Sequence, residues 1–272
     1  MSHLVLVPEL TDARLDVFAR LSEHQLRNAL EVERGVFIAE SHLVVETALD
    51  SGAEPLSFLV DERDLAASEA LLVRAGDEVP AYVLPHEQIA RLTGFGLTRG
   101  LLCAMRRPPS HSVAEVTSNA CRVVVLEDLV DVANVGAVFR NAAALGADAV
   151  IVSPRCADPL SRRAARVSMG CVLKLPWARA EKDEWPRRTI ELLHGQGFSC
   201  LALALEPDAV PLDDPSLVAV DRRALLFGSE GYGLSRAALD ACDRSVIIPM
   251  SRGVDSLNVA ASSAVAFWQL FR

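Results

Sequence analysis

The sequence has no long hydrophobic run, few aromatic side chains and no excess of positive charge. No apolar stretch approaches the roughly 20 residues that cross a bilayer. The first residues, MSHLVLVPELTD, lack the charged start and small-residue cleavage site of a signal peptide. We therefore expect a soluble cytoplasmic protein without a membrane partner. Lys and Arg number 27 against 36 Asp and Glu, so the charge of the whole chain does not indicate nucleic-acid binding.

Several motifs of common sites are also missing. The six cysteines stand singly, without a C-x-x-C pair or a histidine at metal spacing, so we expect reduced, mostly buried thiols and no metal. The sequence contains no P-loop, H-E-x-x-H or G-x-S-x-G motif. GFGLTRG at 94–100 only superficially suggests a dinucleotide-binding loop. Its last glycine comes one position late and it precedes a strand, whereas the true motif follows one.

The 272 residues are 51% hydrophobic, and short apolar runs alternate with stretches of helical period. This alternation predicts an α/β fold. In the first 107 residues, Ser41 stands where its hydroxyl can cap the start of the helix expected over 41–52. We expect helices over 11–33, 41–52, 64–76 and 86–94, and strands over 35–40, 55–62, 79–85 and 100–105.

Residues 106–120 interrupt the pattern with two adjacent prolines and a tail rich in Ser, Asn and Thr. Because this composition favours neither a helix nor a central strand, we predict a linker over 108–120. It would join a smaller N-terminal α/β domain (1–107) to a second α/β domain (121–272), whose continuous apolar strands indicate a mostly parallel sheet. In the second domain we expect strands over 121–129, 148–153, 171–178, 199–205, 223–229 and 244–250, and helices over 134–145, 159–169, 184–195, 234–241 and 258–271.

Polar residues follow three predicted strands of the second domain, where open α/β sheets bind their ligands. The first group is Asn134, at an expected helix N-cap, with Arg140 in an otherwise apolar helix. The second is Glu230 within the glycine-rich GSEGYG. The third is Ser256 and Asn258, at the start of a helix of small residues. A surface arginine, a tight turn and a capped helix are the alternative interpretations.

Basic residues gather in one stretch of this otherwise acidic chain. On a helix, Arg162 and Arg166 share a face, and Arg155 and Arg163 lie close to them in the sequence. A solvated helix face is the usual meaning of such a cluster. RNA phosphate becomes the better interpretation if the neighbouring loops form an active site.

The order N-x-G-x-x-x-R, R-x-S-M-G, G-S-E-G-x-G and I-P-M…S-L-N-V-A, over about 121–271, closely resembles the SpoU (TrmH) branch of the SPOUT RNA methyltransferases. LRNALEVERGVFIAE is similar to the start of that family's ribosomal-protein-like substrate-binding domain. Here Glu40 is followed by Ser41, where the family more usually has a glycine.

The resemblance implies a trefoil-knotted second domain, S-adenosylmethionine as cofactor, and a homodimer that completes the site. It assigns cofactor contacts to Gly228, Ile248 and Leu257, and catalysis to Asn134, Arg140, Glu230, Ser256 and Asn258. The implied reaction is attack of an RNA ribose 2′-hydroxyl on the methyl group. Because arginine stays protonated, we interpret Arg140 as a clamp on the adjacent phosphate that stabilises the developing alkoxide, in preference to a base.

The resemblance favours ribosomal RNA, of the 23S type, because the additional N-terminal domain is typical of members that act on rRNA. Transfer RNA is the alternative target. A non-catalytic RNA-binding paralogue is a second alternative, disfavoured because every polar motif residue is present. A nicotinamide-dependent oxidoreductase is a third, and it lacks an acceptable glycine motif.

Overall fold

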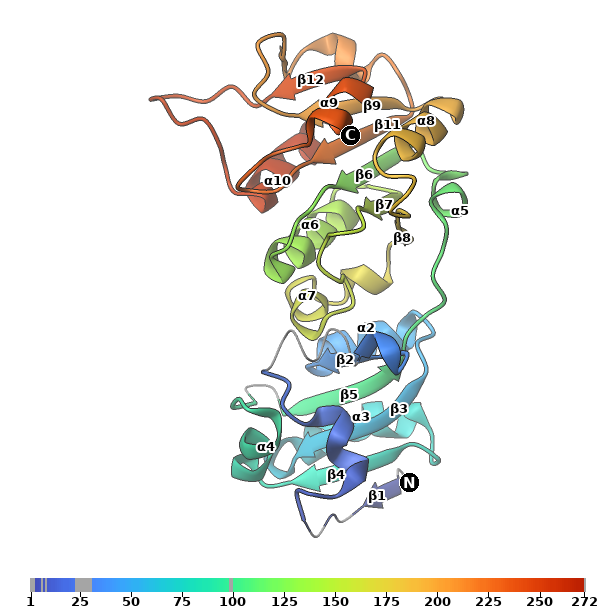
Figure 1. Cartoon of the computed structure of the whole chain (residues 1–272). Coiled ribbons are helices and arrows are strands. Elements are labelled where there is room, and N and C mark those ends of the chain that lie inside the picture. Colours follow the sequence, from blue (N-terminus) through green and yellow to red (C-terminus); the bar gives the residue numbers. More distant parts are fainter. Residues whose placement is uncertain (1–2, 6, 8, 23–30, 98–99, 272) are drawn as a thin grey trace. The chain divides into compact units, whose positions relative to one another are not determined.

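The computed structural model describes residues 3–5, 7, 9–22, 31–97 and 100–271. The chain divides into two compact units (Figure 1). Unit 1 consists of Met1–Pro108 and Leu160–Leu173, and unit 2 of Pro109–Pro159 and Lys174–Arg272. Within the described ranges, we find no helix with the length and apolar character required to span a membrane.

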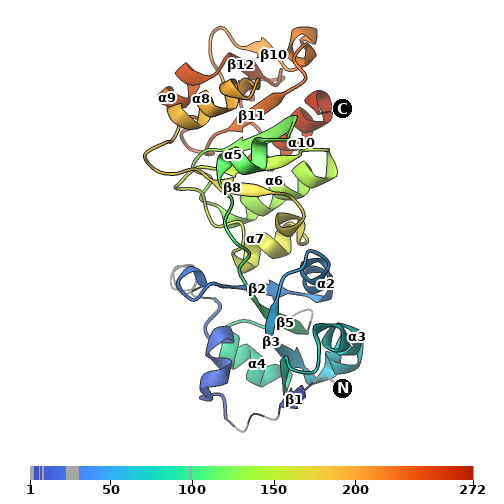
Figure 2. The same ribbon diagram turned by 90° about the vertical axis from the view of Figure 1, so that its right-hand side faces the viewer.

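Unit 1 is a mixed five-stranded sheet with helices on both faces. β4 runs parallel to β1 and β3, whereas β5 runs antiparallel to β3 and β2. The helices α2 (His42–Asp50) and α3 (Leu65–Ala75) cover one face, and η1 (Ala13–Phe18) and α4 (His86–Thr93) cover the other (Figure 2). The strand order is β1 (His3–Val5), β4 (Pro80–Leu84), β3 (Pro55–Asp61), β5 (Leu101–Arg106), β2 (Val36–Glu40).

Unit 1 departs from the sequence predictions in three places. The first part of the helix expected over 11–33 is the 3₁₀ helix η1, which buries Leu15 and Phe18, and residues 23–30 lie outside the described part. The strand β1 was not predicted. Ser41 does not cap α2 with its side chain, because its backbone adopts φ 88° and ψ 152°. Its buried hydroxyl has no hydrogen-bond partner among the described residues.

Unit 2 is a seven-stranded sheet in which every neighbouring pair runs parallel. On one face lie α5 (Val113–Thr117), α8 (Arg187–Gly195) and α9 (Arg236–Ala241), and on the other α6 (Val132–Ala144) and α10 (Val259–Leu270) (Figure 2). The strand order is β10 (Val210–Pro211), β12 (Arg244–Ile247), β9 (Ser199–Leu203), β11 (Arg223–Phe227), β6 (Arg122–Leu126), β7 (Ala149–Val152), β8 (Trp177–Arg179).

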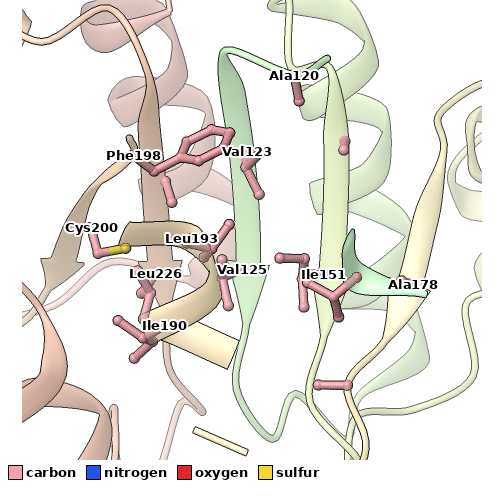
Figure 3. Packing of buried hydrophobic residues seen from close by; sticks show 14 of the residues in the cluster. Ala120, Val123, Val125, Ile151, Ala178, Ile190, Leu193, Phe198, Cys200 and Leu226 are labelled. Atoms are coloured by element: carbon pink, nitrogen blue, oxygen red, sulfur yellow. The ribbon is translucent and has the colours of Figure 1, made fainter. Parts of the chain in front are cut away.

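Apolar side chains of this sheet and of α8 form a continuous core (Figure 3). Val125, Ile151 and Leu226 project from β6, β7 and β11, and Ile190 and Leu193 of α8 pack over them. Burial of each such side chain contributes about 1.5–3 kcal/mol. The α/β class and the parallel sheet expected from the apolar runs are thus confirmed, whereas the knot stays a prediction.

Two segments of the second half differ from expectation. The expected linker carries the short helix α5, because Ser112 and Glu115 form a reciprocal capping box that holds its first turn. The strand expected over 171–178 is instead the 3₁₀ turn η3 (Cys171–Leu173) followed by β8. Pro176 stands directly before β8 and cannot donate to a strand ladder, which explains why the strand begins only at Trp177.

Candidate functional site

Three polar side chains from distant parts of the sequence meet beyond the carboxyl ends of the strands in unit 2. The amide of Asn134 donates to Oε1 of Glu230, with 2.5 Å between the heavy atoms. The amide of Asn258 donates to the same Glu230 oxygen at 2.9 Å and to Oδ1 of Asn134 at 3.2 Å. The structure therefore joins three of the five polar residues that the sequence pointed to.

Helix caps hold two of these side chains in place. The N-cap of α6 is Asp131, not Asn134 as predicted, because the Asp131 carboxylate accepts from the backbone N–H groups of Ala133 and Asn134. The Asn134 amide is thereby left for Glu230. Asn258 caps α10, accepting from the N–H of Ala260 at 2.9 Å, while its own amide group donates to Glu230.

The two helices that carry the asparagines are locked together by a residue that sequence reasoning missed. Asn141 of α6 donates to the carbonyl of Ala260 at 2.7 Å and to the hydroxyl of Ser263 at 3.0 Å, both on α10. Ser263 is fully buried. The sequence did contain a signal for this residue. Asn141 is a polar amide in an otherwise apolar helix, and a buried amide requires a hydrogen-bond partner.

The loop that carries Glu230 is a tight turn between β11 and α9. Ser229 and Gly233 exchange two backbone hydrogen bonds, of 3.1 and 2.8 Å. A Cβ atom on Gly228 would lie 2.1 Å from the backbone carbon of Gly233. Only glycine at position 228 permits this close return of the chain.

A buried carboxylate fixes the far end of the same loop. Glu127, 3% exposed, follows β6 and accepts from the indole N–H of Trp185 at 2.9 Å. It also accepts from the backbone N–H and the hydroxyl of Ser235, which is the N-cap of α9. Glu127 was not among the residues predicted from the sequence. Its position directly after a buried strand was a signal, because a buried carboxylate requires hydrogen-bond donors.

A cleft of about 490 Å³ lies beside the Glu230 loop, over the carboxyl ends of β9, β11 and β12. Gly228, Ile248 and Leu257, the three residues predicted to contact a cofactor, all line it. Glu230 and Ser256 line it as well. This volume lies within the range of small-molecule sites, roughly 300–1,000 Å³.

The lining of the cleft is acidic. It contains the carboxylates of Glu206, Glu230 and Asp255 and, as far as the described residues extend, no lysine or arginine. Arg236 pairs with Glu206 at 3.1 Å. Asp255 instead accepts from the hydroxyl of Ser256 at 3.2 Å. Such a cleft favours a cationic ligand and disfavours a pyrophosphate.

The other two predicted polar residues lie apart from the three joined side chains. Ser256 is exposed, and its hydroxyl contacts Asp255 rather than Glu230. Arg140 is exposed on α6 and forms no hydrogen bond or ion pair within the described part of the chain. Because it stands six positions after Asn134, its side chain leaves α6 about 120° away around the helix axis.

The predicted basic cluster has mixed surroundings. Arg162 and Arg166 of α7 (Arg162–Val167) both bind the carboxylate of Glu40, within unit 1. The Arg162 side chain is only 13% exposed and lies over the ring of Phe95, 4.1 Å from its centroid. Arg163 is exposed. Arg155 is also exposed and pairs with Asp128 in unit 2.

Among the residues that the structure describes, one group of potential metal ligands lies outside the cleft. His194, Cys200 and Asp243 offer ligand atoms within 4.8 Å of one another. Asp243 accepts from the backbone N–H of Cys200 at 2.7 Å and lies 3.1 Å from Nε2 of His194. Burial raises the pKa of the Cys200 thiol well above its usual value, which keeps it protonated. These hydrogen bonds explain the arrangement without an ion.

Comparisons with known proteins all find similarity to RNA methyltransferases. The profile described as the SpoU rRNA Methylase family matches residues 122–268. An uncharacterized tRNA/rRNA methyltransferase of Mycobacterium bovis is 45% identical over 262 residues, which cover 96% of this chain and 89% of that protein. An AdoMet-bound rRNA methyltransferase from Sinorhizobium meliloti has a similar structure, with a TM-score of 0.82 at 22% identity over 98% of this chain and 97% of that one. A crystal structure of an RNA 2′-O ribose methyltransferase gives 0.76 at 26% identity, with 98% and 97% covered.

Proposed function

The chain belongs to the SpoU rRNA methylase family, and on that premise we propose that it methylates a ribose 2′-hydroxyl of ribosomal RNA, using S-adenosylmethionine. The observation that carries the proposal is the union of Asn134, Glu230 and Asn258 beside an acidic cleft. The 26%-identical neighbour described as an RNA 2′-O ribose methyltransferase supports the choice of the ribose oxygen.

The cleft has the chemistry that S-adenosylmethionine requires. Its apolar lining suits the adenine ring, and Asp255 and Glu230, which have no cationic partner among the described residues, suit a sulfonium and an ammonium group. Gly228, Ile248 and Leu257 would hold the cofactor. When bound, the cofactor supplies the electrophilic methyl group. The same acidity argues against a nicotinamide dinucleotide, whose pyrophosphate would face carboxylates without a lysine or arginine in the lining.

The polar residues would position the nucleophile. Two asparagine amides hold one oxygen of Glu230, and this carboxylate in turn orients Asn134 and Asn258 beside the nucleophile. The ribose hydroxyl must lose its proton as it attacks, and Ser256 would accept that proton while passing its own hydroxyl proton to the Asp255 carboxylate. Arg140 would clamp the adjacent phosphate and stabilise the developing negative charge. Positioning of this kind accounts for much of the rate enhancement in a direct transfer.

We propose that Arg140 acts in the site of a second copy of the chain. In its own chain it points away from Asn134 and has no partner among the described residues. A homodimer that brings α6 of one copy to the cleft of the other would complete the site. Within that dimer, Arg155, Arg163 and the exposed part of Arg166 would contact RNA phosphates. Arg162 would contribute mainly through its contact with Glu40.

Ribosomal RNA is the proposed target because the five-stranded sheet of unit 1 lies outside residues 122–268, the region that matches the SpoU family. In the family that the sequence resembles, an additional N-terminal domain of this kind is typical of members that act on rRNA. The test is transfer of labelled methyl groups to total rRNA and total tRNA, followed by mapping of ribose methylation with and without the gene. Label in tRNA alone would overturn the rRNA assignment, and absence of label in either RNA would favour a non-catalytic RNA-binding protein.

The role of Arg140 is tested with mixed variants. Arg140→Ala should abolish transfer while S-adenosylmethionine binding stays nearly unchanged by calorimetry, and the exposed Arg188→Ala on α8 is the matched control. Mixing Arg140→Ala with Glu230→Ala protein should restore activity, because one site of each mixed dimer would contain both residues. No restoration in proven mixed dimers would show that Arg140 acts within its own chain.

A further inference from the structure

Tyr232 is the most exposed large hydrophobic residue of the described chain, with a relative exposed area of 97%. It stands in the loop of Glu230 and lines the same cleft. Aromatic rings normally bury a large part of their surface, and the aromatic side chains around the unit 2 core do so. A ring that is left open beside a reaction site is therefore a candidate for a ligand contact.

The loop holds this ring outward by its backbone. The Ser229–Gly233 hydrogen bonds close the turn, and the N–H of Tyr232 donates to the hydroxyl of Ser229 at 3.3 Å. The flanking Gly231 and Gly233 have no side chains, so both faces of the ring stay accessible. The backbone position of Tyr232 is thus set before any ligand arrives, which lowers the loop entropy lost on binding.

Resting on the proposed function, we infer that Tyr232 is a stacking platform for an unpaired RNA base next to the methylated ribose. The loop from Gly228 to Leu234 contains no lysine or arginine, so it offers RNA a ring face and not a phosphate contact. Unpaired bases stack on aromatic side chains in this way, and the stacking tolerates different bases.

The surroundings of the ring favour a base over a protein partner. The neighbours of Tyr232 in the loop are Ser229, Glu230 and two glycines, and the exposed apolar side chains of the cleft, Leu205 and Leu257, belong to other segments. A single ring in a polar loop matches the size of one base. The substrate class that follows is RNA whose target nucleotide lies in a loop, bulge or end, since a base inside a continuous duplex has no free face to offer.

The test compares Tyr232→Ala with Tyr232→Phe in the full-length protein. The Ala variant should raise the KM for the RNA identified by ribose mapping by a factor of about 5 to 150. The Phe variant should keep it within about twofold, because the ring is retained. Affinity for S-adenosylmethionine, measured in both variants, separates a loss of RNA contact from a loss of cofactor binding. Truncation of the exposed Val218 to Ala, outside the cleft, is the control for a general surface effect.

A direct readout uses RNA with 2-aminopurine beside the target nucleotide, since its fluorescence falls on stacking. Wild type and Tyr232→Phe should quench it, and Tyr232→Ala should not. Equal KM and equal quenching in all three would overturn the inference, as would a shift of Tyr232→Ala from dimer to monomer in sedimentation, which would assign the ring to a second copy. Wild-type protein without methyl transfer would instead contradict the proposed function.

Discussion

Asn258 donates to Glu230 over 2.9 Å with the nitrogen of its amide, and caps α10 with the oxygen of the same amide. One side chain therefore ties the start of a helix to the loop that carries the carboxylate. The two functions can be separated, because a carboxylate can cap a helix but has no hydrogen to donate to Glu230, and a serine hydroxyl can cap a helix but is shorter than the asparagine amide.

Replacement of Asn258 by Asp should separate helix capping from activity. The new carboxylate keeps the cap but repels Glu230, so we expect methyl transfer to fall by about 10²-fold or more. The free energy of unfolding should change by less than about 1 kcal/mol. Chemical denaturation and single-turnover transfer measure the two effects. Asn258→Ser keeps a cap without added charge, and full activity in that variant would contradict the role of the amide.

Replacement of two glycines of the same loop by alanine should affect S-adenosylmethionine affinity differently. At Gly228 a Cβ would meet the backbone of Gly233, so the turn cannot close and S-adenosylmethionine affinity should fall at least tenfold. At Gly231 a Cβ would meet nothing within 4 Å, so Gly231→Ala is the matched control and should bind normally. Calorimetric titration of both variants decides this, and equal affinities would contradict the assigned cleft.

Glu40 should be the more costly of two carboxylates to neutralise in unit 1. Its side chain is 1% exposed and binds both Arg162 and Arg166, so Glu40→Gln leaves a largely buried arginine uncompensated. We expect a loss of about 3 kcal/mol in unfolding free energy. Glu54→Gln breaks a pair with Arg106 in which both partners are more than half exposed, and should lower the unfolding free energy far less than Glu40→Gln does. Urea denaturation of both variants gives the comparison.

Asp61 should make unit 1 sensitive to acid. The hydrogen bond from Arg63, with a further one from His86, lowers the pKa of the Asp61 carboxyl from 3.8 to about 2, against the opposing effect of burial. Its stabilisation is therefore complete above about pH 4 and is lost as pH falls toward 2. Because Arg63 is mostly exposed, we expect about 1–2 kcal/mol. The difference in unfolding free energy between wild type and Asp61→Asn should shrink over this interval, and a constant difference would contradict the assignment.

Ser41→Gly should stabilise the protein. Ser41 has φ 88° and ψ 152°, a region that essentially only glycine adopts without strain, and its buried hydroxyl is unpaired among the described residues. We expect a gain of about 1 kcal/mol, measured as a higher denaturation midpoint. Ser41→Ala removes the hydroxyl but keeps the strain, and should gain less. An equal gain from both would place the cost in the hydroxyl alone.

The sequence by itself determined the α/β class, most element positions and the three polar segments. Continuous apolar runs such as VVVL and ALLF indicate buried parallel strands, because their side chains face helices on both sides of the sheet. Strand-end loops of a parallel sheet share one edge, which explains why Asn134, Glu230 and Asn258 could be expected to meet.

Only the tertiary structure decided which side chains these residues contact. Glu127 and Asn141 are separated in the sequence from their hydrogen-bond partners by 108 and 122 positions. The local sequence around each residue does not indicate which distant residue it contacts. Two arginines of one predicted basic cluster bind Glu40, because a buried carboxylate requires compensation that its own strand does not offer. The local sequence determines which secondary structure element carries a polar side chain. Tertiary packing determines which residue that side chain contacts.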